Sequence, residues 1–203
     1  MQLNASRRGG GGFSIIELVI VVAVIAVVSA AAVPAIGGWT ANARVRSVAE
    51  SLQNDLRLAQ AEAMRRNRQT VFALTSTTPD WNTTPAANGK NWYVRAQPLT
   101  NSSETASKAL SLVTVDTSAA QAGVSITGPA LLCFNSMGQI IAVDSASTGL
   151  STACSATSPT TYTISRAGAD RSLKVLVYLG GRVFMCDASK TLSSTDPDGC
   201  PAS

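Results

Sequence analysis

Histidine is missing from this sequence of 203 residues, and its absence excludes several kinds of active site. Without imidazole there is no Ser–His or Cys–His pair to activate a nucleophile, and there is no histidine ligand for a metal ion. The glycine run 9–12 lacks the lysine of a phosphate-binding loop, and no pair of carboxylates stands in a recognisable catalytic context. We therefore expect a protein that is not an enzyme and that binds no cofactor or metal.

Charged residues are also few, at 14% of the chain, and their balance is close to neutral. The 16 basic residues include Arg7 and Arg8, so removal of residues 1–12 would leave 14 basic against 12 acidic side chains. Net charge alone therefore does not indicate a nucleic-acid partner. The length suits one anchor segment followed by one globular domain.

No charged residue occurs from Leu18 to Asn42, and this run is long enough to cross a membrane. As a helix its 25 residues would extend about 37 Å, against a hydrocarbon core of about 30 Å. Arg7 and Arg8 precede the run, so the positive-inside tendency places the N-terminus in the cytoplasm. An ionised group costs about 2.5–3.5 kcal/mol at the centre of a membrane helix. Glu17 immediately precedes the uncharged run, within the apolar segment, and is therefore expected to have a function.

Two kinds of export signal fit this N-terminus. A secretory signal peptide needs a small-residue cleavage site, and "VSAAAVPA" (28–35) offers one. An anchor helix is favoured by the length of the run, by Glu17 and by the amphipathic pattern that follows directly. Pro34 is expected to kink this helix rather than end it, because proline removes one backbone hydrogen bond.

The amphipathic part carries apolar residues three or four positions apart, which predicts one buried helix face. These residues are Val45, Val48, Leu52, Leu56, Ala59 and Ala63. Arg65, Arg66 and Arg68 follow at the predicted end of the helix, where cations interact favourably with the helix dipole.

After Asn67 the pattern changes to short runs rich in β-branched and aromatic residues, separated by turn formers. The predicted strands cover 70–75, 91–96, 109–115, 123–127, 130–135, 138–143, 161–165, 172–179 and 182–186. Gly180 and Gly181 suit a tight hairpin between the last two strands.

Trp92 and Tyr93 are expected in the core. The segments 76–90, 100–108 and 144–160 have the composition of exposed loops. The predicted fold class is α+β, with a long N-terminal helix packed on a small antiparallel β-sheet.

The four cysteines all lie in the C-terminal part, and none belongs to a C-x-x-C pair. Behind an export signal, an even number of cysteines predicts disulfides, and four thiols allow three connectivities. We favour pairing between sequence neighbours, Cys133 with Cys154 and Cys186 with Cys200.

The stretch "GGFSIIELVIVVAVIAVVSAAAVPAI" (11–36) resembles the type III signal and N-terminal helix of type IV pilins and pseudopilins. The resemblance implies that prepilin peptidase cuts between Gly12 and Phe13 and methylates the new Phe13 amine. It also implies that Glu17 pairs with the N-terminal amine of a neighbouring subunit in the apolar core of a filament, where a low dielectric strengthens the pair.

The stretch "LRLAQAEAMRRNRQTVFAL" (56–74), followed by "DW" and "NGKNWYV", is similar to the GspH/FimT branch of minor pilins and pseudopilins. This resemblance implies a cleaved leader (1–12), a membrane and filament-core helix half (13–40), and an outward domain (41–203). The protein would sit in the bacterial inner membrane and then in a filament with major and minor pilins. It would help to initiate a type IV pilus or form its tip; an H-type pseudopilin of type II secretion is the alternative.

The C-terminal stretch 179–200 resembles the end of FimT-like minor pilins, where a Gly-Arg-x-Arg motif is implicated in DNA capture. Gly181 and Arg182 match the motif, but Phe184 stands where its second arginine belongs. The alternative is a solvated hairpin edge on which Arg182 discourages strand pairing. If the resemblance holds, double-stranded DNA would bind weakly through Arg182, Lys190, Arg171 and Lys174.

The processing site gives the first testable prediction. The mature chain should begin with N-methylated Phe13, and a bulky residue in place of Gly12 should block cleavage. Intact-mass measurement of the protein purified from its host membranes would check this. A mature chain starting after Ala32 or Ala35 would show instead that a secretory signal peptidase had acted.

Overall fold

The computed structural model describes residues 14–98, 110–115 and 121–202, and within the first helix it leaves out the side chains of 31–36. The chain divides into two compact units after Gly37.

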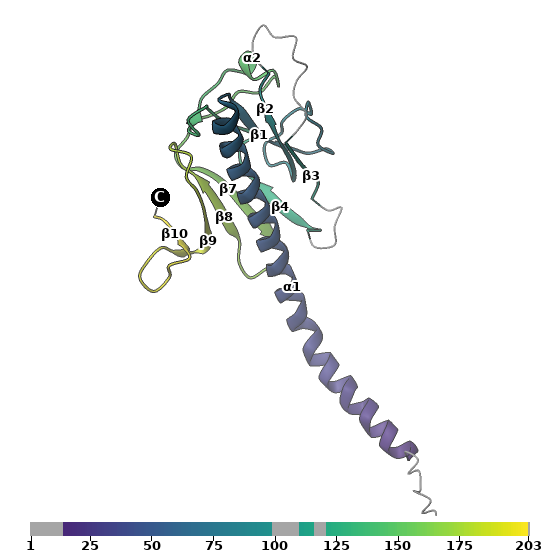
Figure 1. Cartoon of the computed structure of the whole chain (residues 1–203). Coiled ribbons are helices and arrows are strands. Elements are labelled where there is room, and N and C mark those ends of the chain that lie inside the picture. Colours follow the sequence, from purple (N-terminus) through teal and green to yellow (C-terminus); the bar gives the residue numbers. More distant parts are fainter. Residues whose placement is uncertain (1–13, 99–109, 116–120, 203) are drawn as a thin grey trace, which may run out of the picture. The chain divides into compact units, whose positions relative to one another are not determined.

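The first unit is the N-terminal part of helix α1, which runs from Ile15 to Arg66 (Figure 1). Every residue from 14 to 30 is exposed, including Ile15 at 83% and Leu18 at 62%. Among the residues that the structure describes, no helix combines the length and hydropathy needed to cross a membrane. The helix continues through Pro34, and the kink predicted there stays a prediction.

The second unit is built on the remaining part of α1. The apolar stripe predicted for it is confirmed, because its six members are all at most 1% exposed: Val45, Val48, Leu52, Leu56, Ala59 and Ala63. They pack in one core with strand residues such as Phe72, Trp92 and Tyr162. Asp55 lies beside this stripe and accepts a hydrogen bond from the Trp92 indole at 2.7 Å.

The α+β class, with a long helix packed on mainly antiparallel strands, is confirmed, and the described strands form two sheets where the sequence analysis expected one. The first sheet has the order β3-β2-β1-β5-β6 and the second β10-β9-β8-β7-β4. The bounds are β1 Thr70–Thr75, β2 Asn91–Ala96, β3 Ser111–Val113, β4 Val124–Thr127, β5 Leu131–Phe134, β6 Ile140–Ile141, β7 Thr160–Arg166, β8 Leu173–Val177, β9 Val183–Thr191 and β10 Gly199–Cys200. All named pairings are antiparallel except that of β10 with β9, which is parallel.

The two sheets share one core because both face the same stripe of α1. Phe72 of the first sheet meets Tyr162 of the second edge to face, with ring centroids 5.6 Å apart. Such aromatic contacts contribute about 0.5–1.5 kcal/mol beyond the area they bury. Trp92 and Tyr93 are fully buried, as predicted.

The segment 144–160 is not simply an exposed loop, and this prediction was wrong for part of it. It contains the short helix α2 (Ser145–Thr148), whose N-terminus is capped by Asp144. Thr148, Leu150 and Cys154 are buried against the first sheet. The segment 100–108 lies outside the described residues.

Arg95 of β2 explains how this segment is held. Its side chain is 2% exposed and donates to the carbonyl oxygens of Thr148 and Trp81, both at 3.0 Å, and to Gln97 Oε1 at 3.0 Å. Burial lowers the pKa of Arg95. The segments around residues 81 and 148 are therefore clamped to the sheet by one buried cation.

The turn between β8 and β9 packs against α1. Gly181 has a φ of +82°, and a Cβ atom there would collide with the Gly138 carbonyl oxygen and with the amide of Gln60. Gln60 of α1 also donates to that carbonyl at 3.1 Å. Only glycine combines this backbone conformation with so close an approach.

These contacts predict that Gly181→Ala destabilises the domain by about 1–3 kcal/mol, because the new methyl group meets backbone and the left-handed conformation becomes strained. Gly180→Ala is the matched control, since a Cβ there has no atom within 4 Å. Urea unfolding followed by tryptophan fluorescence would compare the two. Equal midpoints would show that the turn can move away from α1 at little cost.

Candidate functional site

Glu17 lies in the first turn of α1, where a carboxylate interacts favourably with the helix dipole. Its neighbours Ile16 and Leu18 are 68% and 62% exposed. No cation among the described residues pairs with it, so a single carboxylate stands on an otherwise apolar helix surface. The predicted cleavage and methylation positions, Gly12 and Phe13, lie outside the described residues.

The cysteines are joined as sequence neighbours. Cys133 of β5 is bonded to Cys154, and Cys186 of β9 to Cys200 of β10. The first bond fastens the segment after α2 to the first sheet. The second closes a C-terminal loop whose ends are 14 positions apart in the sequence.

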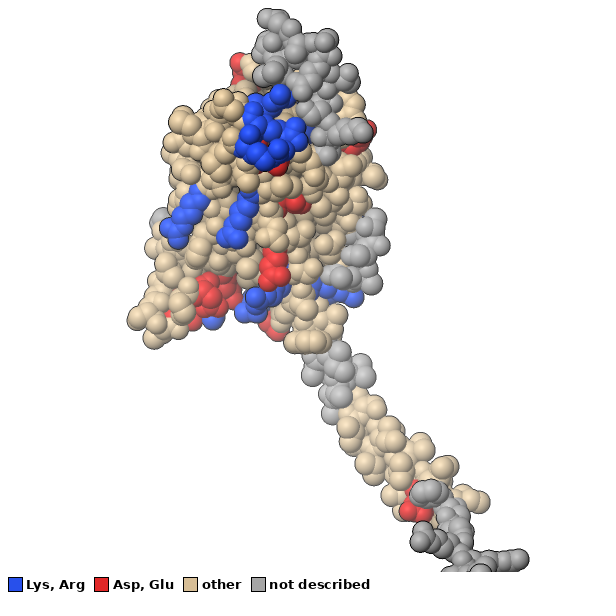
Figure 2. Space-filling view, in the orientation of Figure 1, with Lys and Arg blue, Asp and Glu red and all other residues tan. Residues whose placement is uncertain are grey.

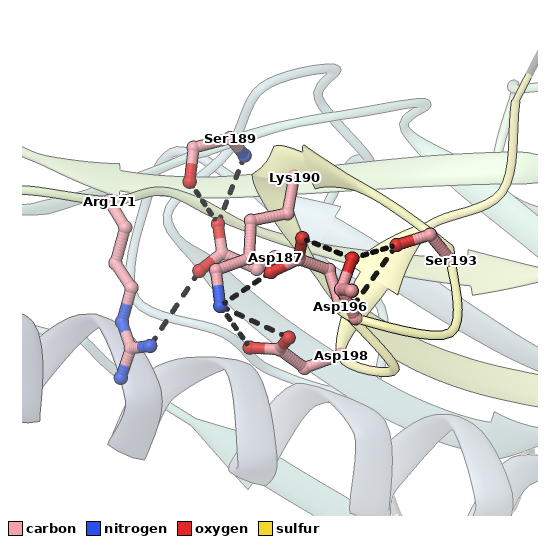
Figure 3. Close-up of polar contacts among 8 residues, drawn as sticks. Arg171, Asp187, Ser189, Lys190, Ser193, Asp196 and Asp198 are labelled. Atoms are coloured by element: carbon pink, nitrogen blue, oxygen red, sulfur yellow. Dashed lines mark hydrogen bonds and ion pairs between the residues drawn. The ribbon is translucent and has the colours of Figure 1, made fainter.

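Within this C-terminal loop Lys190 is surrounded by carboxylates (Figure 3). Its Nζ lies 3.1 Å from Asp198 and 3.4 Å from Asp196. The hydrogen bond to Asp198 raises the pKa of Lys190, with a further contribution from Asp196. The charge of Lys190 is therefore largely compensated within its own loop.

Arg171 is also compensated, by Asp187 (Figure 3). The two side chains are 3.6 Å apart, and Asp187 is only 3% exposed. Burial would raise the pKa of Asp187, but hydrogen bonds from Ser189 and the charges of Arg171 and Lys190 outweigh burial and lower it. Asp187 thus stays ionised and pairs with Arg171.

Arg182 and Lys174 have different surroundings. The Arg182 guanidinium lies 5.9 Å from the ring centroid of Tyr178 and 5.6 Å from that of Phe184, within the range of a cation–π contact. Lys174 lines a pocket of about 320 Å³ with no acidic residue among its described lining residues. The pocket is formed by Pro159, Thr161, Lys174, Leu176, Tyr178, Cys200, Pro201 and Ala202. The four predicted cations are therefore not equivalent. Arg171 and Lys190 are paired with aspartates. Among the described residues, no acid pairs with Arg182 or Lys174.

The end of α1 carries a charged group whose arrangement the sequence analysis did not foresee. Glu62 accepts from Arg65 at 2.6 and 2.8 Å and from Arg66 at 2.7 Å. The hydrogen bonds from Arg65 and then Arg66 lower the pKa of Glu62 to about 2. The sequence could have predicted this group, because Arg65 and Arg66 follow Glu62 by three and four positions, and residues at these spacings are neighbours on a helix surface.

Two protein-family models match this chain. The family described as type II transport protein GspH matches residues 48–181, and the prokaryotic N-terminal methylation motif matches residues 7–33. No curated protein sequence matches the chain significantly.

The fold has distant likenesses among solved structures. Two crystal structures of the Pseudomonas aeruginosa type IV minor pilin FimU are 16% and 17% identical, with TM-scores of 0.43 and 0.45. They cover 71% and 72% of this chain and 94% and 90% of their own. The minor pseudopilin EpsH of the Vibrio cholerae type 2 secretion system is 16% identical, with a TM-score of 0.38, covering 72% of this chain and 97% of its own.

Proposed function

The chain belongs to the GspH family of minor pilins and pseudopilins, and from this premise we propose that it is a minor pilin that helps to start a type IV pilus or form its tip. The observation that carries the proposal is the N-terminal methylation motif at residues 7–33. That motif contains Gly12, Phe13 and Glu17 in the spacing that prepilin peptidase substrates share.

Residues 18–28 of α1 are all apolar and all exposed, which supports this proposal. A helix that is apolar on all sides needs apolar surroundings. In the proposal, residues 13–40 first lie in the inner membrane, with the N-terminus cytoplasmic, and later in the filament core among other pilins. Residues 41–203 then face the periplasm or the cell exterior.

In this proposal Glu17 determines the register in which subunits assemble in the filament. A carboxylate inside an apolar filament core is costly unless a cation meets it, and the methylated amine of a neighbouring subunit's first residue is such a cation. A subunit in the wrong register would leave both charges unpaired.

An H-type pseudopilin of type II secretion is the other assignment within the family. Deletion of the gene separates the two. Loss of surface pili with normal export of folded exoproteins supports the pilus assignment, whereas the reverse pattern supports the secretion system.

Substitution of Glu17 tests the assembly role. Glu17→Ala should leave a folded, oxidised, membrane-associated protein that enters sheared filaments at least about tenfold less well, because it leaves a buried amine unpaired. Glu50→Ala is the control, since Glu50 is a partly exposed acid on the same helix and pairs with Arg46 at 2.7 Å. Quantitative immunoblots of filaments and membranes would measure both, and normal incorporation of Glu17→Ala would contradict the pairing.

Weak binding of double-stranded DNA is a second candidate function. It is favoured by the pocket on the second sheet, which has Lys174 in its lining and no acid, and by Arg182 on the adjacent hairpin. Phe184 occupies the position of the absent second arginine and packs on Arg182.

The ion pairs of these cations with aspartates predict which of the cations would contribute to DNA binding. Arg182→Ala should lower the slope of log affinity against log salt by about one, whereas Lys190→Ala should change it little, because Asp196 and Asp198 already compensate Lys190. Anisotropy titrations of the purified protein in the range of about 10⁻⁴–10⁻⁶ M would measure this. Absence of binding at low salt would remove this candidate function.

A further inference from the structure

Three exposed apolar side chains in the second unit belong to elements that meet at one place. Met64 of α1 is 48% exposed, Met137 in the turn before β6 is 70% exposed, and Leu179 in the turn after β8 is 47% exposed. We call these three residues the Met64 patch. Single exposed apolar residues are normal on a protein surface, but grouped ones mark interaction sites.

Three contacts fix these elements to one another. A Cβ atom on Gly138 would lie 3.0 Å from Met64 Sδ, so Met64 lies against the turn that carries Met137. The Ile140 amide donates to the Leu179 carbonyl at 2.9 Å. Gln60 donates to the carbonyl of Gly138 at 3.1 Å. The patch therefore rests on a preformed base, which reduces the entropy lost on binding.

Arginines lie on the same elements as this base. Arg65 is 64% exposed, Arg57 reaches the Val183 carbonyl at 3.5 Å, and Arg182 lies over Tyr178 in the same turn as Leu179. Arg65 and Arg66 share one acid, Glu62, so these three side chains together keep a net positive charge. Figure 2 shows basic side chains gathered over the end of α1, with further basic side chains beside it.

We propose that the Met64 patch is a docking surface for a different pilin-type subunit, one that presents an apolar side chain ringed by carboxylates. Methionine and arginine are enriched at protein interfaces, and the arginines around the patch call for an acidic partner. The inference deepens the proposed function and rests on it.

Two alternative occupants fit the structure less well. A second copy of this chain would offer the loop 186–200, but Lys190 and Arg171 already occupy the aspartates there. A lipid surface would have to reach the far end of the domain, because Met64 lies 25 residues beyond Trp39, or about 37 Å along the helix.

Site-specific photocrosslinking in the piliated host tests the proposal with the full chain. Benzoylphenylalanine in place of Met137 should give, on irradiation, a heterodimer whose second chain carries an N-terminal methylation motif by mass spectrometry. The same probe at Leu112 is the control, because Leu112 is 52% exposed on edge strand β3. It should give at least about tenfold less of that product.

Charge reversal tests the acidic partner. Arg65→Glu should reduce the Met137 crosslink at least about tenfold, since like charges would then face each other. Arg46→Glu is matched to it, because Arg46 is 62% exposed on the same helix and also pairs with a glutamate. It should leave the yield unchanged.

Each other outcome overturns the inference. A homodimer would assign the patch to a second copy, and equal yields at Leu112 or insensitivity to Arg65→Glu would show that no specific acidic partner docks there. The proposed function has a separate test. It fails if the mature chain does not begin at Phe13, whatever the crosslinks show.

Discussion

The burial of one narrow stripe of α1 is the interaction on which the rest of the domain depends. From Val45 to Ala63 the helix presents small and medium apolar side chains, so two sheets can approach it at once. Burying a side chain of the size of valine or leucine contributes about 1.5–3 kcal/mol. Loss of the stripe would leave both sheets without a common surface. Among the described residues, the members of this core all belong to the second unit.

Charge on the domain is organised by local compensation. Lys190 and Arg171 are held by aspartates, and Arg65 and Arg66 share Glu62. A count of basic residues along the sequence therefore overstates how many are available to an anionic partner. Exposed pairs of this kind add little stability, typically about 0–1 kcal/mol, so their main effect is on what the surface can bind.

Local patterns in the sequence were enough to predict the buried helix stripe, strands β1 and β2, and the burial of Trp92 and Tyr93, because each follows from periodicity or side-chain type. The division into two sheets was not predicted, since strand partners are chosen by contacts between distant segments such as Phe72 and Tyr162. The extension of β9 to Thr191 was missed for the same reason: its polar end is paired only because β10 returns alongside it. The differing surroundings of the four C-terminal cations likewise depend on the folded loop.

Arg95 has a consequence for how the domain opens. The buried guanidinium of Arg95 donates to carbonyl groups of two separate segments, at Trp81 and at Thr148. If either segment left the sheet by itself, Arg95 would lose one of these hydrogen bonds while remaining fixed by the other. The surface chain near Trp81 and Thr148 is therefore coupled to β2, and its amide protons should exchange with solvent in large cooperative openings rather than by the independent fraying typical of loops.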